Sequence, residues 1–166
     1  SFDGEPFQLE RNDKEGPNAI HGFVRTLPWQ VSRAEADCAS FDICLGAEEY
    51  GRKGYPFSLA IHVTYRLDDK GLSCAFNVQN TGTRPAPVGI GFHPYFTVGA
   101  TVIDEAEARI PSAAFLEFND QLAPTGTVLP AAGTECDCRE FRRIGQKRFN
   151  HCYVQLDRDT AGMATA

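Results

Sequence analysis

The fold class follows from the segment Leu59-Ala60-Ile61-His62-Val63-Thr64-Tyr65-Arg66-Leu67, in which apolar and polar residues alternate. Successive side chains of a β-strand point to opposite faces of the sheet, so this pattern is typical of a strand with one buried face. A turn-forming Asp68-Asp69-Lys70-Gly71 follows, and the alternation resumes from Leu72 to Val78. The two runs predict an antiparallel hairpin.

Outside the hairpin, shorter apolar patterns predict further strands. Phe41, Ile43 and Leu45 predict an earlier strand, and Ala113 to Phe118 predict a later one. Ser32 to Asp37 could form one helical turn, but no segment keeps apolar residues at helical spacing for three turns. The chain is therefore predicted to be all-β, an antiparallel sandwich of many short strands separated by Gly, Pro and Asn turns.

Length and charge limit the possible classes of function. The 166 residues fall in the single-domain range, so we expect one domain over residues 1–166. With 16 basic and 22 acidic side chains the net charge is -6, which does not favour nucleic acid or an anionic membrane surface as a partner. The sequence shows neither a membrane-length apolar run nor a secretory signal, so we expect a cytoplasmic protein. Oligomeric state is left open.

The six cysteines are interpreted as free thiols, because no secretory signal places them in an oxidising compartment. The one close pair, Cys136-Asp137-Cys138, has a C-x-C spacing and lacks the second pair or the histidine that a zinc site needs. We therefore expect no metal site.

A histidine framed by glycine, proline and aromatic residues is the first candidate for chemistry, in Gly91-Phe92-His93-Pro94-Tyr95-Phe96. Pro94 removes a backbone donor and restricts the chain, and the aromatic residues could form a wall on which a sugar ring packs. The alternative is a core histidine satisfied by a hydrogen bond among core aromatics. Spacing does not separate the two interpretations.

A second candidate group combines an imidazole, a guanidinium and an indole in one short segment. His21 and Arg25 lie four residues apart beside Gly22, and Trp29 follows. They could converge on a ligand, or Gly22 could mark a turn with Arg25 solvated and Trp29 in the core. Of the other histidines, His62 falls on the polar face of the predicted hairpin and is expected at the surface, and His151 is undecided.

Taken together and in order, these motifs resemble those of the aldose 1-epimerase, or mutarotase, family. The matching segments run along nearly the whole chain: Asn18-Ala19-Ile20-His21-Gly22, Gly54-Tyr55-Pro56-Phe57, Gly91-Phe92-His93-Pro94-Tyr95-Phe96, Ile110-Pro111, Pro124-Thr125-Gly126 and Phe149-Asn150-His151. Each motif alone is only moderately specific, but their order and spacing make coincidence improbable.

The resemblance implies a β-supersandwich of the galactose mutarotase type that interconverts the α and β anomers of a free hexose, without cofactor or metal. It implies His93 as the general acid and His21 as a second imidazole that holds the substrate and polarises the ring oxygen. Sugar contacts would come from Arg25, Tyr95 and Asn150. Arg25 lies in a His-Gly-Phe-x-Arg segment similar to that of a hexose 6-phosphate branch, where it could contact phosphate.

The departures from the family pattern leave alternatives open. The family's glutamate base and an upstream sugar-binding arginine would fall outside residues 1–166, so the chain resembles a middle portion with an incomplete sandwich. By itself it is expected to have weak or no epimerase activity. Asn150 stands where many members have an aspartate, so the negative charge is absent. A carbohydrate-binding module that has lost catalysis is therefore the alternative to an isomerase, alongside the hexose 6-phosphate relative.

Overall fold

The computed structural model describes residues 1–14, 16–147 and 149–166. The chain divides into two compact units, which we call unit 1 (Ser1–Gly91) and unit 2 (Phe92–Ala166), and each is described by itself. The expectation of one domain over residues 1–166 stays a prediction.

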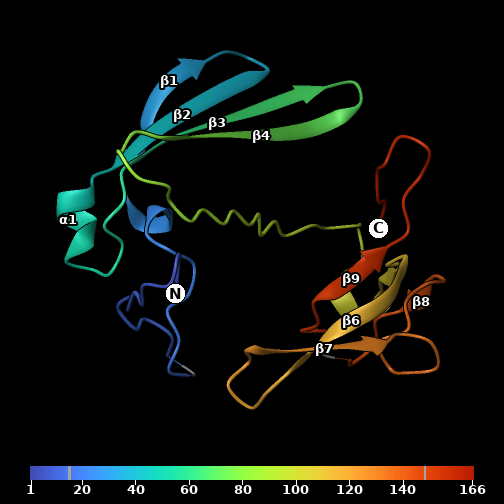
Figure 1. Ribbon diagram of the computed structural model, residues 1–166. Coiled ribbons are helices and arrows are strands. Elements are labelled where there is room, and N and C mark those ends of the chain that lie inside the picture. Colours follow the sequence, from blue (N-terminus) through green and yellow to red (C-terminus); the bar gives the residue numbers. More distant parts are fainter. Residues whose placement is uncertain (15, 148) are drawn as a thin grey trace. The chain divides into compact units, whose positions relative to one another are not determined.

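A four-stranded antiparallel sheet organises unit 1 (Figure 1), in the order β1-β2-β3-β4. Its strands are β1 (Gln30–Ala34), β2 (Cys38–Leu45), β3 (Leu59–Asp68) and β4 (Gly71–Asn80). The predicted hairpin is confirmed, since Ile61 pairs with Val78 and Val63 with Phe76 across β3 and β4. The earlier strand predicted from Phe41 to Leu45 is also confirmed, as part of β2.

The helical turn expected at Ser32 to Asp37 is wrong. Residues 30–34 form β1, whose Val31 pairs with Phe41 of β2. A strand partner satisfies the backbone groups that a single helical turn would leave unpaired, so the tertiary context overrides a weak local preference. The short helix α1 (Ala47–Gly51) was not predicted from the sequence.

The core of unit 1 lies where α1 and the preceding 3-10 helix η1 (Val24–Thr26) meet the sheet. Leu45, Tyr50 and Leu59 are buried there. Partly buried apolar residues surround them: Phe23, Val24, Leu27, Tyr55, Ile61, Val78 and Ala86. The segment that follows His21 is thus anchored in the core through its apolar side chains.

Unit 2 is built on a three-stranded antiparallel sheet in the order β7-β6-β9 (Figure 1). Its strands are β6 (Ser112–Phe118), β7 (Pro124–Pro130) and β9 (Tyr153–Leu156), so the later strand predicted from Ala113 to Phe118 is confirmed. The short strands β5 (Glu107–Ala108) and β8 (Arg142–Arg143) pair with each other, and the 3-10 helix η2 (Ile103–Glu105) precedes them. Within the described ranges, no helix has the length and apolar character needed to cross a membrane.

Candidate functional site

His21 occupies a strained backbone position at the end of a loop in unit 1. Its φ is 63° and that of the following Gly22 is 60°, so both residues are in the left-handed region. For a residue with a Cβ this conformation costs about 1–2 kcal/mol. The imidazole is exposed. Such strain persists only where surrounding contacts over-determine it, and it tends to occur at functional sites.

The residues after His21 are fixed in place by the core. Phe23 packs edge-on against Tyr50, with ring centroids 5.0 Å apart. Trp29 donates its indole N–H to the carbonyl oxygen of Val24 at 2.9 Å, which secures η1. Arg25 lies within η1 and is exposed. The structure therefore places His21 and Arg25 on one anchored segment, which Trp29 holds through its bond to the Val24 oxygen.

His93 lies in a different kind of environment. None of the described residues 85–98 belongs to a helix or a strand, and the His93 side chain is exposed. Its ring stacks in a tilted arrangement on Tyr95, with centroids 5.3 Å apart. Tyr95 and Phe96 are 90% and 82% exposed. The aromatic residues of this motif therefore do not enclose His93 as a core histidine.

Asn150 is exposed in the segment that leads into β9. The next residue, His151, places its ring 5.5 Å from that of Phe115 on β6. His151 and Phe149 line a hollow of about 420 Å³ with Phe115, Thr134, Glu135, Cys136 and Lys147. Sequence reasoning left His151 undecided, because its contact with Phe115 joins residues far apart in the chain.

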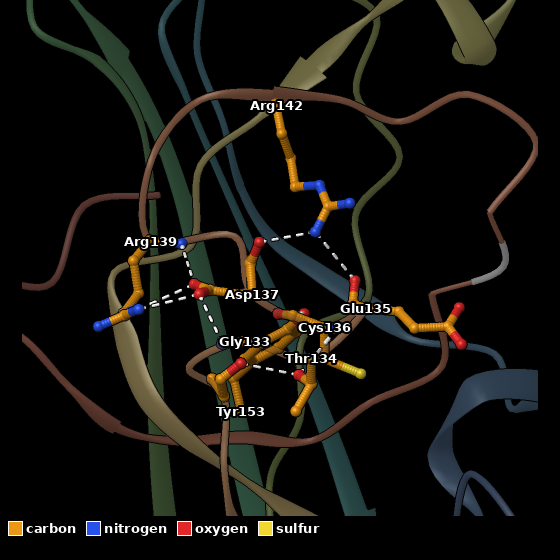
Figure 2. Close-up of polar contacts among 9 residues, drawn as sticks. Gly133, Thr134, Glu135, Cys136, Asp137, Arg139, Arg142 and Tyr153 are labelled. Atoms are coloured by element: carbon orange, nitrogen blue, oxygen red, sulfur yellow. Dashed lines mark hydrogen bonds and ion pairs between the residues drawn. The ribbon is translucent and has the colours of Figure 1, made fainter.

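Figure 2 shows a polar network centred on Asp137 that the sequence did not reveal. Arg139 donates from Nε and Nη2 to the two carboxylate oxygens of Asp137, each at 2.9 Å. These bonds, together with the Gly133 N–H, lower the pKa of Asp137 well below its usual range. Arg142 donates to the backbone oxygens of Asp137 at 2.8 Å and Glu135 at 3.1 Å. The network fixes the loop between β7 and β8.

The Cys136 and Cys138 side chains lie inside this loop and are buried. Tyr153 donates its hydroxyl to the Cys136 carbonyl oxygen at 2.8 Å. Burial raises the pKa of the Cys136 thiol, which disfavours the thiolate form that binds metals. In the part of the chain that the structure describes, no three histidine, cysteine or acidic side chains are grouped so as to hold a metal ion.

His62 is half-exposed on the sheet of unit 1, and it belongs to a hydrogen-bonded chain of polar side chains. Its Nδ1 lies 2.5 Å from Asp42, and its Nε2 lies 3.0 Å from the Thr64 hydroxyl. Hydrogen bonds from Ser32 and His62 lower the pKa of Asp42. Thr64 lies on the same strand as His62, but Asp42 lies on β2 and Ser32 on β1, so sequence spacing alone did not show the contact with Asp42.

The five site residues predicted from the sequence thus fall into two local groups. His21 and Arg25 belong to unit 1, while His93, Tyr95 and Asn150 belong to unit 2. His93 and Tyr95 are in ring contact. The roles assigned to all five stay predictions.

Comparison with known proteins shows the family to which this chain belongs. The chain matches the family model of aldose 1-epimerase over residues 1–165. It belongs to the aldose 1-epimerase family. That match extends through both units of the structure and includes every motif on which the resemblance rests.

Curated relatives of this family member come from bacteria and mammals. The uncharacterized protein YihR of Escherichia coli is 30% identical over 153 residues, covering 92% of this chain and 48% of YihR. The galactose mutarotase of Sus scrofa is 31% identical over 149 residues, covering 88% of this chain and 42% of the relative. The chain therefore spans about half the length of these relatives, or less.

Solved structures agree on the fold. The GalM/aldose epimerase homologue from C. elegans superposes with a TM-score of 0.68 at 18% identity, covering 97% of this chain and 51% of the homologue. Galactose 1-epimerase from Lactobacillus acidophilus gives a TM-score of 0.56 at 24% identity, covering 84% of this chain and 41% of that protein. The prediction of an antiparallel β fold of the galactose mutarotase type is confirmed.

Proposed function

We propose that the protein carrying this chain is an aldose 1-epimerase that interconverts the α and β anomers of a free hexose. The observation that supports this most strongly is family membership over residues 1–165. Relatives named galactose mutarotase, at about 30% identity, point to the same reaction.

The reaction needs one proton removed and one delivered. A base takes the proton of the C1 hydroxyl, an acid protonates the ring oxygen, and the bond between C1 and the ring oxygen breaks to give the open aldehyde. Rotation about C1–C2 and reclosure then produce the other anomer. Histidine, with an ordinary pKa near 6.5, suits the acid role at neutral pH. We assign that role to His93.

The local structure is compatible with these assignments. His93 is exposed and stacks on an exposed Tyr95, so an incoming sugar ring could reach the imidazole and the aromatic face together. His21 is held in a strained conformation, which is a recurrent feature of functional positions. We propose that His21 polarises the ring oxygen and that Arg25, Tyr95 and Asn150 contact the sugar.

Replacement of His93 by Asn tests the proposal. We expect the rate of anomer interconversion, followed by polarimetry, to fall on the order of a hundredfold or more, because general acid catalysis is lost. His62→Asn is the matched control, since it removes an imidazole bound to Asp42 outside the proposed site, and its rate should stay near that of the parent. A His93→Asn variant that folds and retains the parent rate would exclude the assignment.

A hexose 6-phosphate is the second candidate substrate, and Arg25 is the observation that favours it. Its side chain is exposed, and among the described residues none accepts a hydrogen bond from its guanidinium or forms an ion pair with it. A guanidinium can bind phosphate through two parallel hydrogen bonds. Turnover of glucose 6-phosphate above that of glucose, lost in Arg25→Gln, would support this candidate. Equal turnover of both sugars would count against it.

A sugar-binding protein without catalysis is the alternative from another class. It is favoured by Asn150, which cannot supply the charge of a carboxylate. Calorimetric detection of hexose binding by a protein that does not accelerate mutarotation would establish this alternative.

We also propose a cytoplasmic location, supported by six free thiols in the structure. Recovery of the protein from an oxidising compartment in a cell fractionation experiment would contradict it.

A further inference from the structure

Asn12 holds the backbone of the residue that immediately precedes His21. Its Oδ1 accepts a hydrogen bond from the Ile20 N–H at 2.7 Å, and its Nδ2 donates to the Ile20 carbonyl oxygen at 3.0 Å. One side-chain amide therefore binds both polar groups of a single backbone residue. We call this pair of bonds the Asn12 clamp.

The clamp closes a loop whose two ends are also joined through the backbone. The N–H groups of Asn12 and Asp13 both donate to the carbonyl oxygen of Asn18, at 3.2 and 3.1 Å. The Asn18 side chain donates back to Asp13 at 3.2 Å. A Cβ added at Gly16 would lie 3.1 Å from Asp13 and 3.2 Å from Asn18, so the described part of the loop has little spare room.

The clamp acts at the position where the backbone strain begins. Ile20 is fixed on one side, and Phe23 and Trp29 anchor the chain on the other side, three and nine residues later. His21 and Gly22 must span the interval, and both take left-handed φ values. A residue with a Cβ leaves that region unless its neighbours prevent it. The fixed Ile20 backbone is such a constraint.

We propose that Asn12 is a positioning residue for His21: it keeps the imidazole in the orientation that the reaction uses, without touching the substrate itself. This inference rests on the proposed role of His21. Loss of the clamp frees the Ile20 backbone, and the His21 side chain then samples orientations that cannot reach the sugar. Small misplacements of catalytic groups have large effects on rate.

Two variants of Asn12 separate positioning from simple space filling. Asn12→Ala removes both hydrogen bonds. Asn12→Asp keeps nearly the same shape, but its carboxylate cannot donate to the Ile20 oxygen and repels it. Gln8→Ala is the control, because Gln8 is an exposed amide in the same segment whose Nε2 donates to the adjacent Leu9 oxygen at 2.9 Å and not to the His21 region.

The experiment combines steady-state polarimetry with NMR assignment of the His21 backbone, whose chemical shifts respond to φ. In both Asn12 variants we expect the His21 shifts to move and kcat to fall on the order of tenfold or more. KM should change much less, because Asn12 does not contact the sugar. Gln8→Ala should match the parent in the His21 chemical shifts, in kcat and in KM.

Several outcomes would overturn the inference. Unchanged His21 shifts in Asn12→Ala would show that the clamp does not set the backbone, whatever the activity. A parent-like kcat in both Asn12 variants, when His21→Ala has lost activity, would show that positioning is not needed. If His21→Ala itself keeps the parent kcat while Asn12→Ala moves the His21 shifts, the proposed role of His21 fails and the clamp geometry stands.

Discussion

The two histidines that the family resemblance singles out lie in opposite local environments. His21 follows a closed loop, and the residues on both sides of it are fixed by hydrogen bonds and core packing. His93 lies in a segment outside any helix or strand, and its neighbours Tyr95 and Phe96 are largely exposed. The first histidine is oriented by contacts within unit 1. For the second, the described contacts supply a stacked ring but no enclosure.

Of the two histidines, His21 is therefore the one whose backbone is held by contacts within its own unit. Contacts close in sequence can pre-organise His21 at low entropic cost, because the loops that they close are short. The exposed aromatic residues around His93 present apolar surface that a ligand or another part of the folded protein could cover. Substitutions in the two regions should therefore differ in their effect on stability.

The largest effect is expected from truncating a buried aromatic residue of unit 1, in comparison with an exposed one near His93. Tyr50→Ala removes a buried ring from the core of unit 1 and should lower the free energy of unfolding by about 3–5 kcal/mol. Phe96→Ala removes an exposed ring and should change it by about 0.5 kcal/mol or less. Urea unfolding measures both. A fall of more than about 2 kcal/mol in the free energy of unfolding of Phe96→Ala would indicate that Phe96 is buried in the folded protein. The two regions would then not differ in the way described.

A smaller effect should follow from the backbone conformation at His21. At a φ of 63°, glycine carries no Cβ penalty, so His21→Gly should be more stable than His21→Ala by about 1 kcal/mol. At position 93 the order should reverse by about 0.5 kcal/mol, because glycine there only adds entropy to the unfolded chain. Paired unfolding curves measure both differences. The same order at the two positions would show that the strain at His21 is not present in solution.

The anchor behind His21 should contribute a similar amount. Trp29→Phe keeps most of the ring but removes the bond to the Val24 oxygen, so the free energy of unfolding should fall by about 1 kcal/mol. Arg25→Gln, on the same segment and exposed, serves as the control and should change it by about 0.5 kcal/mol or less. Equal values for the two variants would mean that the indole bond does not hold η1.

The smallest effect concerns unit 2, where the stabilising contribution of Asp137 depends on pH. The folded-state pKa of Asp137 is depressed, so its stabilising contribution is present above the unfolded carboxyl pKa, near 4, and is lost as pH falls through the lower folded value. Asp137→Asn should therefore lower the Tm by a few degrees at pH 7 and by less at pH 3. Asp120→Asn, in an exposed turn, should lower it at neither pH. A deficit in Asp137→Asn that is equal at both pH values would contradict the ion pair with Arg139.

The local pattern of apolar and polar residues was enough to predict part of the fold. The β3–β4 hairpin followed from strict alternation around a turn, and β6 followed from a short apolar run. The expected helical turn at Ser32 to Asp37 failed, because pairing with β2 decides that segment. The helix α1 has only five residues, too few to show a helical apolar period, and it was missed. The first failure thus comes from a contact outside the segment, and the second from a helix too short to leave a pattern.

The fold class, the family and the candidate residues could all be inferred from the linear chain, because alternation and ordered motifs are properties of the sequence. Four features emerged only from the folded chain: the Asn12 clamp, the left-handed backbone of His21, the His62–Asp42 pair and the Asp137 network. These features depend on which backbone groups meet after the chain has turned and on the dihedral angles that the meeting imposes. Residue types and spacings do not specify either quantity until the path of the chain is known.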